Sequence, residues 1–211
     1  MSKKIFIFGT SGFSRELNDV ASALGYEGIY IAENKEDLEF ADASHEVITE
    51  SDINRFENEA FAIGIGENTV RAKIAGRYKF RLKFPTLIHP DTSLGRGQKE
   101  VLNRTTGNII CAGVRVTNNV SFGNFCIVNL NSTIGHDVII GDYVNIAPGA
   151  NISGNVHLSR GVWVGTNAAV NQGTVGNLLT IGENTIVGSG SVVVKSCEPN
   201  AIYVGIPAKI K

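Results

Sequence analysis

A histidine followed at once by a carboxylate, His136-Asp137, is the pair in this sequence best suited to move a proton. A neutral imidazole accepts a proton near neutral pH, and a neighbouring carboxylate fixes its tautomer and supports the resulting cation. The pair therefore predicts a general base, with His136 taking the proton and Asp137 orienting the ring. The alternative is a solvated pair at a surface turn. We interpret His89, beside a proline, as structural and His157 as solvated.

A glycine-bearing loop near the N-terminus is the second candidate site. The apolar run of residues 5–8 predicts a buried parallel strand, and a helix is expected over 14–24. Glycines let the backbone approach a phosphate, and a helix N-terminus offers free N–H groups. Ser11 and Ser14 replace the second and third glycines of the dinucleotide fingerprint. The candidate substrate contacts in this loop are Gly9, Ser11, Gly12 and Phe13.

Two later strands extend this candidate site. Glu33 follows an expected strand at 29–31 and is a candidate ribose partner. Gly66 and Asn68 lie where an expected strand at 60–66 leads into an expected helix at 67–77. Parallel strands place their carboxyl ends at one edge, so these loops are expected to line one crevice. The order of elements predicts half of a Rossmann-like sheet, too short for a complete NAD-binding fold. Nucleotide-sugar binding is favoured over NAD binding or a purely structural turn.

The elements that position His136 follow a six-residue period. Every sixth residue from 110 to 170 is large and apolar: Ile110, Val116, Phe122, Val128, Ile134, Ile140, Ile146, Ile152, Leu158, Val164 and Val170. The residues two positions earlier are small or β-branched from Val114 onward, and i and i−2 share a strand face. Glycine or asparagine recurs after the large residue, where a corner is expected. Such a period predicts a parallel β-helix of stacked coils.

This organisation sets the domain boundaries. Residues 1–85 are expected to form the Rossmann-like domain, 86–108 a junction and first coil, and 109–211 the β-helix with a C-terminal cap. Within the junction, the polar stretch 96–107 is expected to be a loop or an irregular coil. The period is interrupted after Val170 and resumes at Ile181, so a loop within 171–179 is expected to leave the coil.

The six-residue pattern resembles the hexapeptide-repeat acyltransferases, whose fold is a left-handed parallel β-helix. Together with the glycine-rich N-terminal domain, it is similar to bacterial nucleotide-sugar N-acetyltransferases. The stretch from Asn129 to Asp137 (NLNSTIGHD) carries this similarity. The resemblance implies acetylation of the 4-amino group of a nucleotide-linked 4-amino-4,6-dideoxyhexose for surface glycan biosynthesis. It also implies that His136 is the base, oriented by Asp137, and that Asn129 holds substrate.

The same resemblance implies acetyl-CoA as the donor, bound between subunits of a homotrimer. The matching positions for donor contacts are Asn145, Gly154, Thr166, Gly188, Ser189 and, in the closing Val-Gly-x-Pro-Ala-Lys segment, Pro207. That last segment is equally suited to capping the solenoid. The outward-facing Trp163 favours an interface. Related family members are similar to sialic-acid O-acetyltransferases, so O-acetylation of a glycan precursor is an alternative.

Composition narrows the remaining possibilities. The 211-residue chain is 43% hydrophobic with a net charge of −1 and no basic block, which argues against a nucleic-acid partner. No stretch approaches the ~20 apolar residues of a membrane span. The three cysteines are scattered, and a cytoplasmic enzyme is the simplest interpretation. His136 and His157 do not occupy equivalent coil positions, so a zinc site is not expected. A non-catalytic nucleotide-sugar-binding protein is the last alternative.

Overall fold

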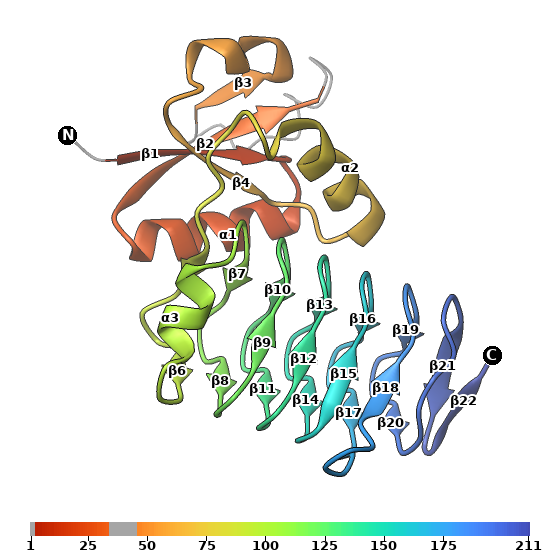
Figure 1. Ribbon diagram of the computed structural model, residues 1–211. Coiled ribbons are helices and arrows are strands. Elements are labelled where there is room, and N and C mark those ends of the chain that lie inside the picture. Colours follow the sequence, from red (N-terminus) through yellow and green to blue (C-terminus); the bar gives the residue numbers. More distant parts are fainter. Residues whose placement is uncertain (1–2, 34–45) are drawn as a thin grey trace.

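The computed structural model describes residues 3–33 and 46–211, which form an α/β domain stacked on a solenoid (Figure 1). The N-terminal domain is built on a parallel sheet with strand order β3-β2-β1-β4. Its strands are β1 (Lys3–Phe8), β2 (Tyr26–Ala32), β3 (Val47–Thr49) and β4 (Ala60–Ile63). This order is half of a doubly wound sheet, as the sequence predicts.

Both faces of this sheet are covered, which explains the continuous apolar run in β1. Ile5 and Ile7 pack against α1 (Gly12–Ala23). Phe6 and Phe8 point to the other face and share a cluster with residues of α2 (Asn68–Tyr78) and the 3-10 helix η2 (Glu50–Arg55). Alternate side chains of one strand thus enter two apolar layers.

Three sheets form the faces of the solenoid, and they are parallel except for the last strand of face 1. Face 1 contains β5 (Leu87–Ile88), β7 (Ile109–Ile110), β10 (Ile127–Val128), β13 (Asn145–Ile146), β16 (Trp163–Val164), β19 (Ile186–Val187), β21 (Ile202–Gly205) and β22 (Ala208–Ile210). Face 2 contains β6 (Ser93–Leu94), β8 (Arg115–Val116), β11 (Thr133–Ile134), β14 (Asn151–Ile152), β17 (Ala169–Val170) and β20 (Val192–Val193). Face 3 contains β9 (Ser121–Phe122), β12 (Ile139–Ile140), β15 (Val156–Leu158) and β18 (Leu179–Ile181).

The six-residue period is confirmed by the strand register. Residues paired on successive coils are 18 apart, as in Ile109, Ile127 and Asn145, so three strands complete one turn. Ten of the eleven large residues of the period are buried, and Phe122 is half-buried against the same core. The smaller residues two positions earlier are also buried, which fills a narrow prism-shaped interior.

The corner asparagines adopt the backbone conformation that the sequence suggests, whereas the glycine directly after the large residue does not. The left-handed backbone region is occupied three positions after each large residue from Ile110 to Val164, for example at Asn119 (φ 57°) and Asn167 (φ 55°). The glycine directly after the large residue serves another purpose. A Cβ on Gly135 would lie 2.7 Å from Gly154 N on the next coil, so the position needs space rather than an unusual φ.

The period is interrupted at two places along the chain. The stretch 96–107, expected to be a loop, contains α3 (Gln98–Asn103), which packs on β9 and stands where face 3 has no earlier strand. The expected excursion after β17 is confirmed, because residues 171–178 leave the coil before β18 and protrude from it (Figure 1). The chain then ends in β22, which pairs antiparallel with β21.

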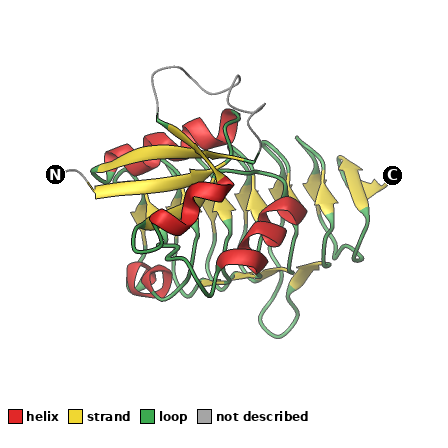
Figure 2. Cartoon of the chain, turned by 90° about the horizontal axis from the view of Figure 1, so that it is seen from above, coloured by secondary structure: helices red, strands yellow, loops and turns green. Residues whose placement is uncertain are grey.

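The two domains are joined through the corners between faces 3 and 1. From above, the N-terminal domain covers the first coils and the C-terminal coils extend beyond it (Figure 2). Arg71 of α2 is 1% exposed and donates to the carbonyl oxygens of Phe125 and Tyr143, both at 2.8 Å. It also bonds the carbonyls of Ile65 (3.0 Å) and Gly66 (2.7 Å). Burial lowers the pKa of Arg71 to about 10, which leaves it a cation at neutral pH.

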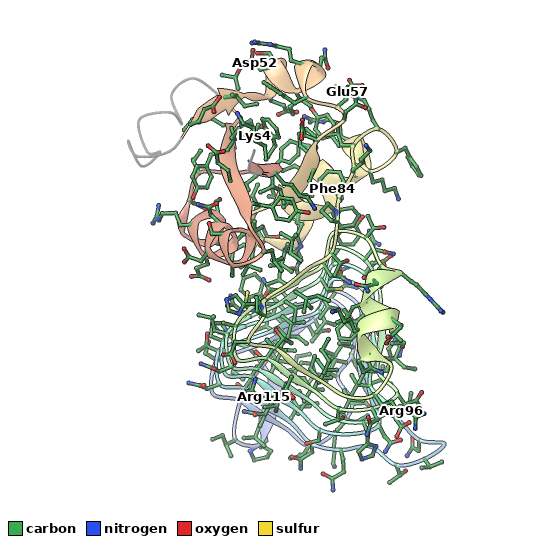
Figure 3. All side chains as sticks on the ribbon, turned by 90° about the vertical axis from the view of Figure 1, so that its left-hand side faces the viewer. Lys4, Asp52, Glu57, Phe84, Arg96 and Arg115 are labelled. Carbon is green, nitrogen blue, oxygen red and sulfur yellow. The ribbon has the colours of Figure 1, made fainter. Side chains whose placement is uncertain are left out.

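An aromatic stack fixes the same junction. Phe125 and Tyr143 both adopt positive φ, and their rings stack with centroids 5.7 Å apart. Phe84, which Figure 3 shows between the domain and the solenoid, meets the Phe125 ring edge-on at 5.4 Å. A bulky side chain in the left-handed region costs about 1–3 kcal/mol, so the packing and the Arg71 bonds must hold these two corners in place.

We predict that Arg71→Met lowers the free energy of unfolding by about 3 kcal/mol, because buried carbonyl oxygens lose a charged donor. Urea unfolding measures the change. The exposed Arg55 of the same domain, whose side chain is 74% exposed, provides the matched control. Arg55→Met is expected to stay within about 0.5 kcal/mol of the parent. Equal stability of the two variants would contradict the role assigned to Arg71.

Candidate active site

His136 lies at the corner between faces 2 and 3, where β11 leads into β12. Its Nδ1 is 2.7 Å from Asp137 Oδ2, and the two side chains are 60% and 42% exposed. The expected pairing of these neighbours is therefore present. It depends on the backbone, because Asp137 has φ 57° and occupies the left-handed corner position. The second carboxylate oxygen, Oδ1, accepts from the Asn119 amide one coil earlier.

The electrostatics of the pair fix its proton arrangement. Hydrogen bonds from Asn119 and His136 lower the pKa of Asp137, so its carboxylate is ionised at neutral pH. An ionised carboxylate can only accept hydrogen bonds, so the proton of the neutral imidazole must lie on Nδ1. The lone pair of Nε2 is then available to a reacting group.

Gly154 lies directly beneath the imidazole, on the following coil. A Cβ at residue 154 would stand 2.5 Å from Nε2, 2.6 Å from Cε1 and 2.9 Å from Cδ2 of His136. The backbone beside it is fixed, because Asn155 N donates to His136 O at 2.9 Å. The excursion 171–178 bonds the same stretch, with Gly173 N donating to Gly154 O at 3.1 Å. Gly154, predicted as a donor contact, thus makes room for the His136 ring.

A second candidate site lies at the carboxyl edge of the N-terminal sheet. A pocket of about 420 Å³ opens where β1, β2 and β4 end, and Gly9, Ser11 and Glu33 line it. Gly66 and Asn68, expected in the same crevice, lie at the domain junction instead. Gly12 and Phe13 begin α1 directly after this lining. Ser14 has a structural role, since its hydroxyl donates to Gly64 O at 2.9 Å and is fully buried.

Sequence reasoning missed two cations of this pocket. Lys73 and Arg77 project into its lining from successive turns of α2. Arg77 is paired with Glu50, whose carboxylate also accepts from the Tyr78 hydroxyl. The sequence does place Lys73 and Arg77 four residues apart, on one face of a helix. Their position over the glycine loop was not predictable, because it depends on the pairing of β1 with β4.

Three predicted binding residues lie at the domain junction. Asn68 donates to Gly161 O at 2.8 Å, and the Asn145 amide, only 4% exposed, donates to Gly66 O at 3.0 Å. Trp163 points outward from face 1 and reaches toward Gly66, 3.9 Å from a Cβ built there. These contacts occupy the polar atoms of Asn68 and Asn145, so their roles toward substrate and donor stay predictions.

The remaining predicted residues lie at other corners. Asn129, Thr166, Gly188 and Ser189 occupy the corner between faces 1 and 2, and Pro207 lies between β21 and β22. Asn129 is held by Leu130 N at 2.7 Å and faces Glu16 of α1 at 3.5 Å. Thr166, Ser189 and Pro207 are exposed, and Gly188 is half-buried. Within one chain, these residues do not meet His136.

Metal-binding clusters and membrane-spanning helices are both absent from the described ranges. Among residues 3–33 and 46–211, no three His, Cys, Asp or Glu side chains group so as to hold a metal ion. No helix in the same part of the chain is long and apolar enough to cross a bilayer.

Comparison with known proteins identifies the N-terminal domain. A family model described as the PglD N-terminal domain matches residues 4–78. This assignment covers the glycine loop and all of α2, so the pocket that carries Lys73 and Arg77 lies within the matched domain.

Solved structures match the whole chain. WeeI from Acinetobacter baumannii AYE is 27% identical over 100% of both chains, with a TM-score of 0.82. The acetyltransferase domain of PglB from Neisseria gonorrhoeae FA1090, in complex with acetyl coenzyme A, is 24% identical over 100% of both chains (TM-score 0.87). PerB from Caulobacter crescentus, in complex with CoA and GDP-perosamine, is 23% identical over 99% of this chain and 97% of that chain (TM-score 0.84).

These matches confirm the resemblance at the level of architecture. The chain has the hexapeptide-repeat acyltransferase fold, with a PglD N-terminal domain followed by a left-handed parallel β-helix. Acetyltransferases with this fold have been solved with CoA or acetyl-CoA bound.

We predict that Gly154→Ala displaces the His136 ring, because the new methyl group would overlap three ring atoms. The backbone of Gly154 is outside the left-handed region, so the thermal midpoint should stay close to that of the parent. A crystal structure of the variant measures the displacement. Gly76→Ala, which meets nothing within 4 Å, is the control. A His136 ring that keeps its place above residue 154 would contradict the prediction.

Proposed function

We propose that the chain is an acetyl-CoA-dependent N-acetyltransferase. Its acceptor is the 4-amino group of a nucleotide-linked 4-amino-4,6-dideoxyhexose, and its pathway is surface glycan biosynthesis. The single observation that carries this proposal is the His136–Asp137 pair, exposed at a coil corner with Nδ1 fixed. The proposed compartment is the cytoplasm, where acetyl-CoA would be the donor.

The geometry of the pair supports a simple proton pathway. The acceptor amine attacks the thioester carbonyl of acetyl-CoA, and the Nε2 lone pair of His136 takes the proton that the amine loses. Asp137 stabilises the imidazolium that forms, through the bond already made to Nδ1. Collapse of the tetrahedral intermediate expels the CoA thiolate, to which His136 can return the proton. Backbone N–H groups of the neighbouring corners are the proposed oxyanion donors.

The pocket of the PglD N-terminal domain supports a nucleoside diphosphate as the handle of the acceptor. The glycine loop of Gly9 and Ser11 and the N-terminus of α1 favour an anion on one side of the pocket. Lys73 adds positive charge from α2, beside Arg77, which is paired with Glu50 in the same lining. Glu33 is the proposed ribose contact. PerB, with this fold, was solved with GDP-perosamine, a nucleotide-linked sugar.

The separation of the predicted residues supports a site between subunits. The proposed donor contacts Thr166, Gly188, Ser189 and Pro207 lie away from the corner of His136. His136 belongs to the row of corners between faces 2 and 3, and Arg96, which follows β6, marks this row in Figure 3. The row lies on the side of the solenoid away from the N-terminal domain. In a homotrimer, one copy would supply the base while its neighbour supplies the nucleotide pocket.

We predict that His136→Gln lowers kcat for acetyl transfer by about 10²- to 10⁴-fold, the usual contribution of a general base. Acetyl-CoA binding should change little, because the variant keeps the corner and its backbone bonds. Steady-state kinetics and calorimetric titration measure the two effects. His157→Gln on face 3 is the matched control, since this histidine lies outward on a neighbouring strand. Unchanged turnover in His136→Gln would contradict its role as the base.

A panel of acceptors tests the chemical class. Nucleotide-linked 4-amino sugars are expected to be acetylated, whereas hydroxyl acceptors such as sialic-acid precursors are expected to be inactive. Transfer to hydroxyl acceptors alone would support the O-acetyltransferase alternative. Failure to bind acetyl-CoA at millimolar concentration would support a non-catalytic nucleotide-sugar-binding protein.

We predict that one of UDP, dTDP, GDP and CMP raises the thermal midpoint, because a ligand that binds only the native state stabilises it. Lys73→Ala should weaken that nucleotide about tenfold, which corresponds to about 1.4 kcal/mol. Lys79→Ala, at the far end of α2, is the control. Equal affinity of the two variants would contradict the assignment of the pocket.

A further inference from the structure

Both oxygens of the Asp137 carboxylate have a defined partner. Oδ2 bonds His136 Nδ1 at 2.7 Å, and Oδ1 accepts from Asn119 Nδ2. Asn119 occupies the same corner one coil earlier, and Asp137 N donates to Asn118 O at 3.1 Å. The carboxylate is thus bound on one side by the imidazole and on the other by a neutral amide donor.

The amide of Asn119 is itself held by buried structure. Asn119 has φ 57°, the left-handed corner conformation. Gln98, at the start of α3, is 3% exposed. In the orientation that satisfies both polar atoms of its side chain, Gln98 donates to Val120 O at 3.0 Å. Its oxygen accepts from the N–H groups of Asn119 and Val120, both at 3.2 Å. The buried Gln98 side chain of α3 therefore fixes the corner from which Asn119 projects.

We propose that Asn119 is a positioning residue, which fixes the Asp137 carboxylate so that it holds His136 in the tautomer required of a base. Asn119 acts through Asp137 and is not placed in contact with substrate. Its effect on turnover rests on the proposed acetyl transfer, whereas its effect on the imidazole does not. Gln98 of α3 supports the same arrangement, because its side chain bonds the backbone of Asn119 and Val120.

The surroundings of Asp137 explain why a second partner is needed. Its side chain is 42% exposed and borders a hollow of about 440 Å³. The hollow is lined by Gln98, Val101, Asn119, Val120, Ser121, Asp137, Ile139 and Leu178, of which only Asp137 is ionisable. Without the Asn119 amide, Asp137 would share its oxygens with water and rotate away from Nδ1. The neutral imidazole would then populate both tautomers, and the Nε2 lone pair would be available only part of the time.

An asparagine at a left-handed corner can have a purely structural role, in which its side chain hydrogen-bonds the next coil. Asn184 provides this comparison, because it has φ 55° and its amide donates to Asn200 Oδ1 at 3.3 Å. Neither Asn184 nor Asn200 has been placed in the catalytic or binding machinery. Replacing either Asn119 or Asn184 by glycine removes a bond between coils but keeps a residue that tolerates positive φ.

The test compares Asn119→Gly with Asn184→Gly in the full-length protein. Nitrogen-15 NMR of the histidine rings, with His136 assigned from His136→Gln, reports the tautomer without requiring activity. We expect parent and Asn184→Gly to show His136 protonated on Nδ1, and Asn119→Gly to show a mixture. Steady-state kinetics should show kcat reduced by about 10- to 100-fold in Asn119→Gly, with the KM for acetyl-CoA within about twofold.

Each outcome decides the proposal. An unchanged His136 tautomer in folded Asn119→Gly would overturn it, as would equal loss of kcat in the two glycine variants. If Asn119→Gly fails to fold, the same tautomer measurement on Asn119→Asp decides, because aspartate tolerates positive φ but offers no amide donor. A mixture of His136 tautomers in that variant supports the proposal, and His136 protonated on Nδ1 alone overturns it. If the parent transfers no acetyl group, the proposed function fails, and the tautomer readout still judges Asn119.

Discussion

The constraint on which this structure depends is the left-handed residue at each corner of the solenoid. From Gly107 to Asn167 one such residue recurs every six positions, and each reverses the chain into the next face. The same conformation serves more than one purpose. It closes the prism, and it turns the Asp137 side chain back onto His136. Phe125 and Tyr143, whose carbonyl oxygens accept hydrogen bonds from Arg71, adopt it as well. Architecture, candidate base and domain docking therefore share one backbone requirement.

The domain junction makes the two candidate sites parts of one rigid body. Arg71 is buried and bonds carbonyls on both sides, while Asn68 and Asn145 add bonds in opposite directions across the same contact. Hinge motion at this junction would leave a buried cation without acceptors, which is costly. The pocket at the carboxyl edge of the N-terminal sheet is consequently held at a fixed distance from the corners of its own solenoid.

The sequence predicted what repeats and what lies within one short stretch. The six-residue period gave the coils, and adjacency gave His136 with Asp137. Contacts that depend on topology were not predictable, because Lys73 and Arg77 reach the glycine loop only through the pairing of β1 with β4. Arg71 left a faint signal, since it shares a helix face with the buried Ala75 and Tyr78. The stretch 96–107 was misjudged because its polar residues cap an open end, where α3 needs few apolar side chains.

The reversed direction of β22 has a consequence for how copies of this chain meet. Every earlier strand of face 1 is parallel to its neighbours, which would let one solenoid continue into another end to end. β22 presents an antiparallel edge instead, so the first coil of another copy would meet a strand that runs the wrong way. Lys209 adds positive charge to that edge. The reversed strand thereby blocks the parallel pairing through which face 1 could extend onto a strand of a second copy.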